Sequence, residues 1–221
     1  MALSAHGQVE MFFDQAEFEA ALMGSGAMLE TVDFENNNVN SDDVIGFPDM
    51  TPLEFGVPLL DQGGAGFPMG LSNPLLRIRA TGPVREGLVI FGENALVALD
   101  DDNQGISPPS PSVGPLDFND ALMIEIQDSG VVGIGFELSS TSLVVGADSY
   151  WLTVVDLEGV EILDIEFSDF GLTGFLGLFV DGNEFGSITI NNIFGAQFFA
   201  GELIGDTQLW TTPTSFVLGL E

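Results

Sequence analysis

Residues 173–191, TGFLGLFVDGNEFGSITIN, constrain the fold more than any other stretch. The apolar run at 175–180 is shorter than the ~18 residues of a membrane span and too rich in glycine for a stable helix. Residues 181–184, DGNE, are typical of a tight turn, because Asp, Gly and Asn tolerate positive φ. Beyond them, Ile188 and Ile190 alternate with polar residues, as in a half-buried strand. The stretch therefore predicts two strands joined by a tight turn.

The same alternation recurs upstream, in residues 121–138 and in two runs that flank a turn at 156–159. Residues 29–35, LETVDFE, indicate a first strand. Ahead of it, Asp14 and Glu17 match a capping box, which predicts a helix of about ten residues that Gly24 ends. Many short strands with one helix predict an all-β protein, a jelly-roll-like antiparallel β-sandwich with one short N-terminal helix.

The pattern divides the chain into three parts. Residues 1–11 are expected to form a flexible N-terminal segment, and residues 212–221 a C-terminal tail. Residues 12–211 are expected to form a single sandwich domain with long loops at 36–87 and 100–118, where prolines and glycines leave room only for short strands.

Charge excludes one class of partner. The chain has 34 acidic residues, three arginines and no lysine, a formal net charge of −31. Phosphate backbones and anionic bilayers repel such a polyanion, so nucleic-acid binding is excluded. No apolar run has the length of a transmembrane segment. The carboxylates admit three explanations: solubility in a salty medium, bound calcium, or attraction of a cationic partner.

Export is expected from the start of the chain. MALSAHGQ resembles the small-residue end of a signal peptide behind a starting Met. Cysteine is absent, so neither a disulfide framework nor a thiolate metal site exists, and this leaves the compartment open. We expect a secreted, extracellular or cell-envelope protein.

The order of five motifs carries a resemblance: FFDQAEFEAAL, ETVDFEN, VVGIGFEL, WLTVVDLEGVEI and GFLGLFVDGNEFGSITINN. This order resembles the exported β-sandwich proteins of Gram-negative bacteria that end in a PEP-CTERM sorting tail. The resemblance covers most of the chain and is weakest over residues 36–120, and the tail itself does not occur in this sequence. It implies a secreted or surface-held jelly-roll domain, similar in fold to carbohydrate-binding modules.

Catalytic chemistry finds little support. The only histidine is His6, so neither a Ser-His-Asp triad nor an imidazole metal site can be assembled. Two carboxylates suffice to hydrolyse a glycoside. Among 34 acids, however, some pair always lies at a suitable separation, so the acids indicate no particular reaction. The sequence predicts a protein that is not an enzyme.

Two sets of acidic residues are candidate calcium ligands. Asp100, Asp101 and Asp102 begin an acidic loop that resembles an EF-hand loop but has Pro111 where the bidentate Glu belongs. The alternative for this loop is a solvated acidic surface. The resemblance to sandwich modules implies a second site, where the first strand ends beside the last: Asp33 and Glu35, with Glu202 or Asp206. Its alternative is separately solvated charges at the sheet edge.

Three aromatic residues are candidates for sugar binding: Tyr150, Trp151 and Trp210. Sugar-binding sandwich domains use exposed aromatic faces beside polar groups. The competing interpretation is core or edge packing, which the apolar strand around Trp151 favours.

Self-association is the other expected property. The strands carry no lysine to block pairing at a sheet edge, so strand addition between subunits could build fibres or layers. The sequence thus predicts a non-catalytic secreted, cell-surface or extracellular-matrix structural protein, stabilised by calcium and self-assembling through edge strands. The alternative is a calcium-dependent carbohydrate-binding module, with polysaccharide as the partner.

Overall fold

The structure of the 221-residue chain is a computed structural model. The structure describes residues 9–32, 44–45, 71–72, 75–81, 88–91, 98–99, 105–106, 112–115, 120–127, 129–140, 149–168, 173–181, 184–193 and 202–212. Within these ranges, no helix has the length and apolar character needed to cross a bilayer. Most residues of the two predicted loops, and all but the first residue of the predicted C-terminal tail, lie outside them.

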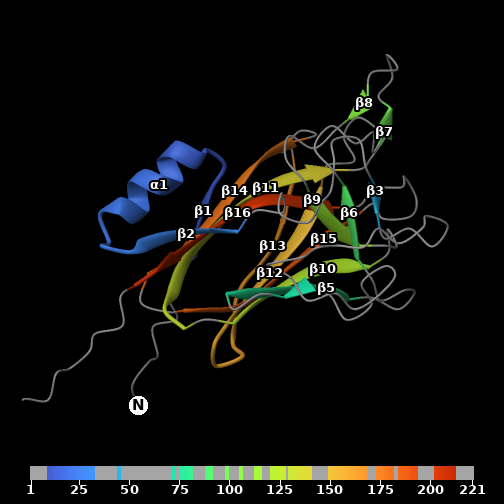
Figure 1. The fold of residues 1–221 in the computed structure, drawn as a ribbon. Coiled ribbons are helices and arrows are strands. Elements are labelled where there is room, and N and C mark those ends of the chain that lie inside the picture. Colours follow the sequence, from blue (N-terminus) through green and yellow to red (C-terminus); the bar gives the residue numbers. More distant parts are fainter. Residues whose placement is uncertain are drawn as a thin grey trace, which may run out of the picture.

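Two antiparallel sheets form the sandwich, and one short helix lies over the larger sheet (Figure 1). The eight-stranded sheet contains, in spatial order, β1 (Val9–Phe12), β14 (Thr173–Val180), β11 (Val131–Ser140), β16 (Glu202–Thr211), β9 (Ser112–Pro115), β6 (Leu88–Phe91) and β3 (Val44–Ile45), with β2 (Met28–Val32) also paired to β16. The six-stranded sheet contains β13 (Glu161–Phe167), β12 (Tyr150–Asp156), β15 (Phe185–Asn192), β10 (Ala121–Ile126), β5 (Leu76–Thr81) and β4 (Leu71–Ser72). A separate pair joins β7 (Ala98–Leu99) to β8 (Gly105–Ile106). The all-β sandwich predicted from the sequence is confirmed.

The strands of residues 173–191 do not form the predicted hairpin. β14 pairs with β1 and β11 in the larger sheet, whereas β15 pairs with β12 and β10 in the smaller one. The chain therefore crosses between the sheets after β14. An apolar-polar alternation fits either arrangement, because it identifies the buried face of a strand and not its neighbour.

The β12–β13 hairpin forms as predicted. Asp156 Oδ1 accepts the backbone N–H groups of Glu158 at 2.9 Å and Val160 at 2.8 Å. Gly159 has a φ of 80°, which glycine adopts without the steric cost of a Cβ atom. Local turn chemistry is sufficient here because both strands adjoin the turn in sequence.

The inward faces of the two sheets make the main core. In β5, Leu76, Ile78 and Ala80 are buried, and the residues between them face outward. Equivalent apolar residues of β10, β12, β15, β11, β14 and β16 meet them in one cluster. Each strand thus places every second side chain in the core, which leaves its other face available for another purpose.

One boundary predicted from the sequence is wrong. Residues 9–11 were expected in a flexible segment, but β1 pairs with β14, with Val9 opposite Val180 and Phe12 opposite Gly177. Val9 and Met11 also pack against the main core. The pairing with a distant strand orders this segment, and a local sequence pattern does not reveal such a partner.

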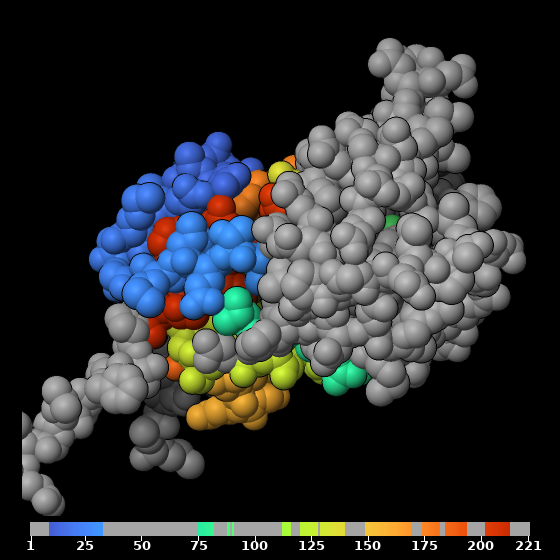
Figure 2. All heavy atoms as spheres, viewed as in Figure 1, coloured from blue at the N-terminus to red at the C-terminus, as the bar shows by residue number. Residues whose placement is uncertain are grey.

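Helix α1 (Gln15–Met23) begins where the capping pattern predicts. Asp14 Oδ1 accepts the backbone N–H of Glu17 at 2.9 Å, and Gly24 follows the last turn. Only Phe18 and Leu22, four residues apart on one face, are buried. They pack on the outer surface of the larger sheet; in Figure 2 the blue residues of the N-terminal region lie over the red residues of the C-terminal one.

Glycines make room for this helix. Gly135 and Gly177 lie opposite each other on β11 and β14, directly below Phe18. A Cβ atom at Gly177 would lie 2.6 Å from Cδ2 and 2.7 Å from Cγ of Phe18. The bare backbone therefore allows the Phe18 ring to approach the sheet.

The first prediction concerns this contact. Gly177→Ala should lower the free energy of unfolding by about 1–3 kcal/mol, because its methyl group must displace the Phe18 ring. Gly24→Ala is the matched control: its Cβ atom would meet nothing closer than a carbonyl oxygen at 3.8 Å, so we expect a change of at most about 0.5 kcal/mol. Urea unfolding measures both. Equal effects of the two substitutions would contradict the packing described.

Candidate functional site

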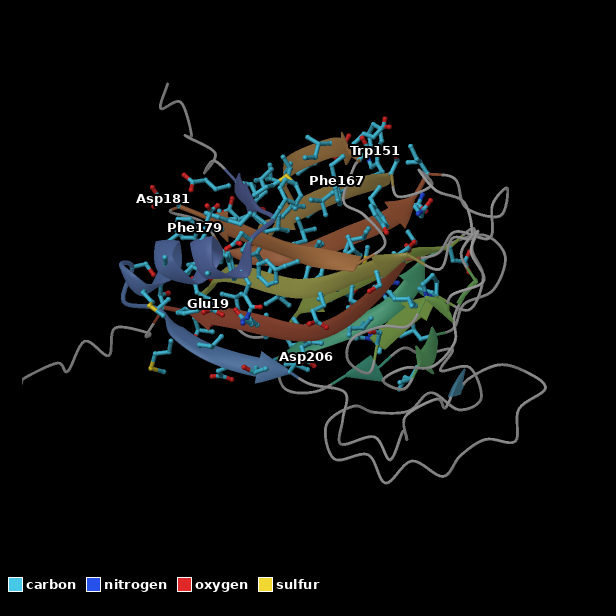
Figure 3. All side chains as sticks on the ribbon, turned by 90° about the horizontal axis from the view of Figure 1, so that it is seen from above. Glu19, Trp151, Phe167, Phe179, Asp181 and Asp206 are labelled. Carbon is cyan, nitrogen blue, oxygen red and sulfur yellow. The ribbon has the colours of Figure 1, made fainter. Side chains whose placement is uncertain are left out.

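Trp151 is the large aromatic residue on the outward face of the smaller sheet. It lies on β12 between the inward-facing Tyr150 and Leu152, and its side chain is 42% exposed. Trp151 Nε1 donates to Asp164 Oδ1 at 2.6 Å, and Thr153 Oγ1 donates to the same oxygen at 2.9 Å. Asp164 on β13 therefore fixes the orientation of the indole while part of the residue stays accessible. In Figure 3, Trp151 lies close to Phe167 and far from Asp206.

Short polar side chains continue this face across the sheet. Asn191 on β15 is opposite Trp151, Thr189 is opposite Thr153, and Ser187 is opposite Val155. Directly opposed residues in a sheet project from the same side, so these side chains lie beside the indole. They are half-buried and carry hydroxyl or amide groups that donate and accept hydrogen bonds.

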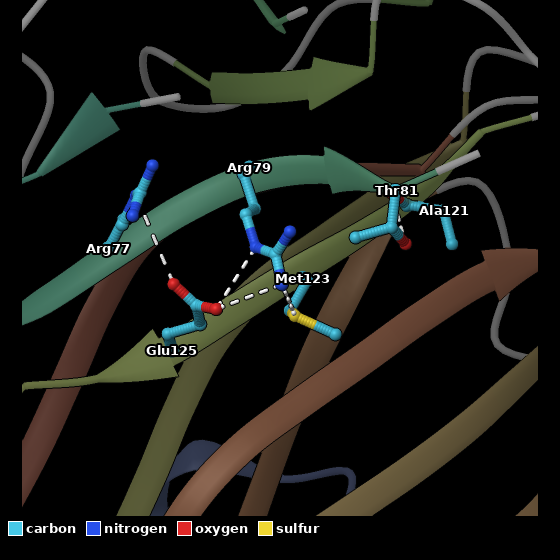
Figure 4. Close-up of polar contacts among 6 residues, drawn as sticks. All are labelled: Arg77, Arg79, Thr81, Ala121, Met123 and Glu125. Atoms are coloured by element: carbon cyan, nitrogen blue, oxygen red, sulfur yellow. Dashed lines mark hydrogen bonds and ion pairs between the residues drawn. The ribbon is translucent and has the colours of Figure 1, made fainter. Parts of the chain in front are cut away.

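Charged side chains lie at the far end of the same face (Figure 4). Arg77 and Arg79 project from β5, opposite Glu125 and Met123 of β10. Arg79 Nε and Nη2 each lie 3.0 Å from Glu125 Oε1, and Nη2 also lies 3.2 Å from Met123 Sδ. Arg77 Nε lies 3.9 Å from Glu125 Oε2. One carboxylate thus lies between two guanidinium groups.

We call this surface the Trp151 face. It consists of the outward residues of five strands: Glu161, Asp164 and Glu166 of β13, Trp151, Thr153 and Val155 of β12, Ser187, Thr189 and Asn191 of β15, Ala121, Met123 and Glu125 of β10, and Arg77, Arg79 and Thr81 of β5. Three strand spacings separate β12 from β5, a distance of about 14 Å. The face is mostly polar and has one exposed aromatic ring.

Of the three aromatic residues predicted to bind sugar, only Trp151 is exposed. Tyr150 is fully buried and stacks on Phe167, with 5.3 Å between ring centroids. Trp210 is 4% exposed because α1 covers it, and the ring centroids of Trp210 and Phe18 are 6.5 Å apart. Neither can contact a sugar in this structure, so both assignments are corrected. Trp151 is not a core residue, because the alternation in β12 places it on the face opposite to Tyr150, and the alternative of edge packing stays open.

The sequence interpretation missed the polar part of the face. Asp164, Arg79 and Glu125 come from three segments that are far apart in the chain, so no local motif connects them. The one available signal was the concentration of all three basic residues within residues 77–85.

The predicted calcium ligands are only partly described. Asp33, Glu35, Asp100, Asp101 and Asp102 lie outside the described residues. Asp206 lies at a shift in the pairing of β16 with β11, next to Thr207, which is opposite Val32 at the end of β2. β2, which overlaps the strand expected at residues 29–35, therefore ends beside β16, as the resemblance to sandwich modules implied. Among the described residues, no three His, Cys, Asp or Glu side chains lie together in a way that could hold a metal ion.

Glu202 links the two sheets. It begins β16 in the larger sheet, and its carboxylate accepts the backbone N–H of Leu122 on β10 at 2.8 Å and that of Asn192 on β15 at 3.1 Å. Burial raises the pKa of Glu202 to about 8, and the nearby buried carboxylate of Asp120 acts in the same direction. The backbone N–H groups oppose this rise in the pKa but do not cancel it.

Comparisons with known proteins add little. No protein-family model and no curated protein matches the chain. Two similar solved structures are mutants of a family 29 carbohydrate-binding module, one of them complexed with cellulohexaose. The complexed mutant has 12% identity and a TM-score of 0.32 over 46% of this chain and 69% of that one. For the other mutant the identity is 12% and the TM-score 0.30, over 48% and 73% of the two chains. Similarity at this level does not indicate a ligand.

The second prediction uses Glu202. Because its folded pKa of about 8 exceeds the ordinary 4.5, the folded state binds more protons than the unfolded state between these values. Its contribution to stability therefore decreases as pH rises through this window, by at most about 1.4 kcal/mol per pH unit, and levels off above pH 8. Urea unfolding of the wild type and Glu202→Gln at several pH values measures it.

Glu202→Gln should be less stable than the wild type at pH 6, because one backbone N–H loses its acceptor. The stability difference between the two should then shrink as pH rises towards 8. Parallel stability curves over this range would show that the ionisation of Glu202 is not linked to folding.

Proposed function

We propose that this protein is a non-catalytic carbohydrate-binding protein and that polysaccharide binds on the Trp151 face. One observation carries the proposal: an exposed indole, fixed by Asp164, lies in a row of hydroxyl and amide side chains on an open sheet surface. This combination supplies an apolar ring for stacking and polar groups for hydrogen bonds.

The indole suits the apolar face of a sugar ring. Its N–H is already bonded to Asp164, so the ring needs little further ordering when a ligand binds. Thr189 and Asn191 then lie next to the stacked sugar, where their polar atoms can exchange water for sugar hydroxyls. The sheet holds all these positions at fixed spacings, which a repeating polymer can match.

Three other expectations from the sequence stay predictions: export, the resemblance to PEP-CTERM-type proteins, and self-assembly. For self-assembly, β13 is the relevant edge strand of the smaller sheet, and it carries the exposed Glu161, Asp164 and Glu166. Two copies paired through β13 would bring like charges together, which is unfavourable unless cations screen them.

The third prediction tests sugar binding. Trp151→Ala should lower the affinity for a bound polysaccharide by about 10-fold or more, because truncating a tryptophan that anchors a binding surface commonly costs more than about 1.4 kcal/mol of binding free energy. Leu157→Ala is the control, since Leu157 is 50% exposed but lies in the β12–β13 turn and outside the Trp151 face. Affinity electrophoresis against a panel of soluble glycans, followed by calorimetry, measures the effect.

Two results would count against the proposal. One is that no glycan of the panel is retained by the wild type. The other is that Trp151→Ala and Leu157→Ala bind equally well while both keep the wild-type melting temperature.

The fourth prediction concerns calcium. If Asp33, Glu35 and Asp206, or the loop that begins at Asp100, hold the ion, then millimolar calcium should raise the melting temperature and a chelator should lower it, because binding to the folded state alone stabilises it. Asp206→Asn should reduce the calcium-dependent shift if the first group is correct. Identical melting curves with calcium and with chelator would refute both sites.

A further inference from the structure

We infer that the Trp151 face recognises a polysaccharide whose neutral backbone carries occasional anionic groups, and that Arg77 and Arg79 bind the anionic group. This inference rests on the proposed function. Its starting point is the distribution of positive charge. The chain has only three basic residues among 221, and two of them project from β5 onto the same face as Trp151.

The guanidinium groups are accessible to a ligand. The side chains of Arg77 and Arg79 are 37% and 41% exposed, whereas that of Glu125 between them is 27% exposed. Arg79 uses Nε and Nη2 in its contacts with Glu125 and Met123, and Nη1 makes none of these contacts (Figure 4). A guanidinium group has five N–H donors, so it can bind an additional carboxylate or sulfate oxygen without releasing Glu125.

The charges of the face are separated along its length. Arg77, Arg79 and Glu125 give the β5 end a net charge of +1, from two positive groups and one negative group. Glu161, Asp164 and Glu166 give the β13 end a charge of −3, from three negative groups. Four strand spacings, about 19 Å, separate the two ends. An anionic group is therefore attracted to the arginine end and repelled from the other, which would orient the bound chain.

The net charge of the whole protein limits how acidic the polymer can be. At −31 the protein repels a densely charged polyanion. Salt screens this repulsion beyond about 8 Å at physiological ionic strength, so a single anionic group in contact with the arginines is affected much less than a continuous row. A sparsely substituted polysaccharide satisfies both conditions. Arg79 and Arg77 lie three strands away from Trp151 and also two and four residues along the strand direction, so the acidic group would lie about 16–20 Å from the sugar on Trp151.

Matched ligands isolate the anionic group. We would titrate the full-length protein with a glucuronic-acid-substituted xylan and with the same polymer after chemical reduction of its carboxyl groups to alcohols. A sparsely sulfated galactan and its desulfated form provide the equivalent pair for sulfate, and polygalacturonate represents a densely charged polymer. The wild type should bind at least one sparsely substituted anionic form about 10-fold tighter than its neutral form, and it should bind polygalacturonate weakly.

Three variants separate the arginines from the tryptophan. Arg79→Gln should lower the affinity for the anionic form by about 10-fold and change the affinity for the neutral form much less, so that the preference for the anionic form is lost. Glu125→Gln should raise affinity for the anionic form, because it removes the carboxylate that competes for both arginines. The triple variant Arg77→Gln/Arg79→Gln/Glu125→Gln removes both guanidinium groups without leaving an unpaired carboxylate behind, and it should also lose the preference for the anionic form. Melting temperatures confirm that each variant is folded.

The outcomes distinguish this inference from the proposed function. Suppose that Trp151→Ala weakens binding to both the anionic and the neutral form of a polymer, while Arg79→Gln and Glu125→Gln change the affinity for neither form. The inference is then overturned and the proposed function stands. The inference is also overturned, and the proposed function kept, if the wild type binds the neutral forms as tightly as the anionic ones. If Trp151→Ala changes no affinity, both are overturned. Opposite effects of Arg79→Gln and Glu125→Gln on the anionic form support the inference, because a loss of folding would not raise affinity.

Discussion

Burial of one face of every central strand is the constraint on which the rest of this structure depends. The inward residues of the two sheets form a single apolar cluster, and because side chains alternate along a strand, the outward residues take no part in it. In β5 this places Leu76 and Ile78 inside and Arg77 and Arg79 outside. The core therefore fixes the spacing and direction of the outward groups while leaving their chemistry free, and a binding surface can be built there without a cost in core packing.

The two outer faces of the sandwich have become different surfaces. On the larger sheet, Gly135 and Gly177 have no side chains, so α1 can pack closely on the sheet, and the helix covers Trp210. On the smaller sheet, no described helix covers the outer face, and Trp151 stays accessible. One tryptophan is thus a packing residue and the other a candidate contact residue because of what lies over each.

The charged side chains differ in the same way between the interior and the surface. Most carboxylates of the described residues are exposed or half-buried, where water reaches them, whereas the buried Glu202 is held by two backbone N–H groups from the opposite sheet. That arrangement joins the sheets at one end of the sandwich but makes the link dependent on the protonation of Glu202. On the surface, by contrast, two of the few positive charges remain exposed beside Glu125, where a ligand can reach them.

The amino-acid sequence by itself determined the features that depend on neighbours along the chain. Asp14 starts α1, Asp156 closes the β12–β13 turn, and the alternation in each strand selects its buried side. Only the tertiary structure decided which strands pair, and it separated β14 from β15 although the sequence suggested a hairpin. It also decided which tryptophan α1 covers, and it placed Arg79 on the same face of the smaller sheet as Trp151. The reason is physical: a cap or turn is stabilised by residues a few positions apart, whereas a strand gains its stability from whichever distant partner buries its face best.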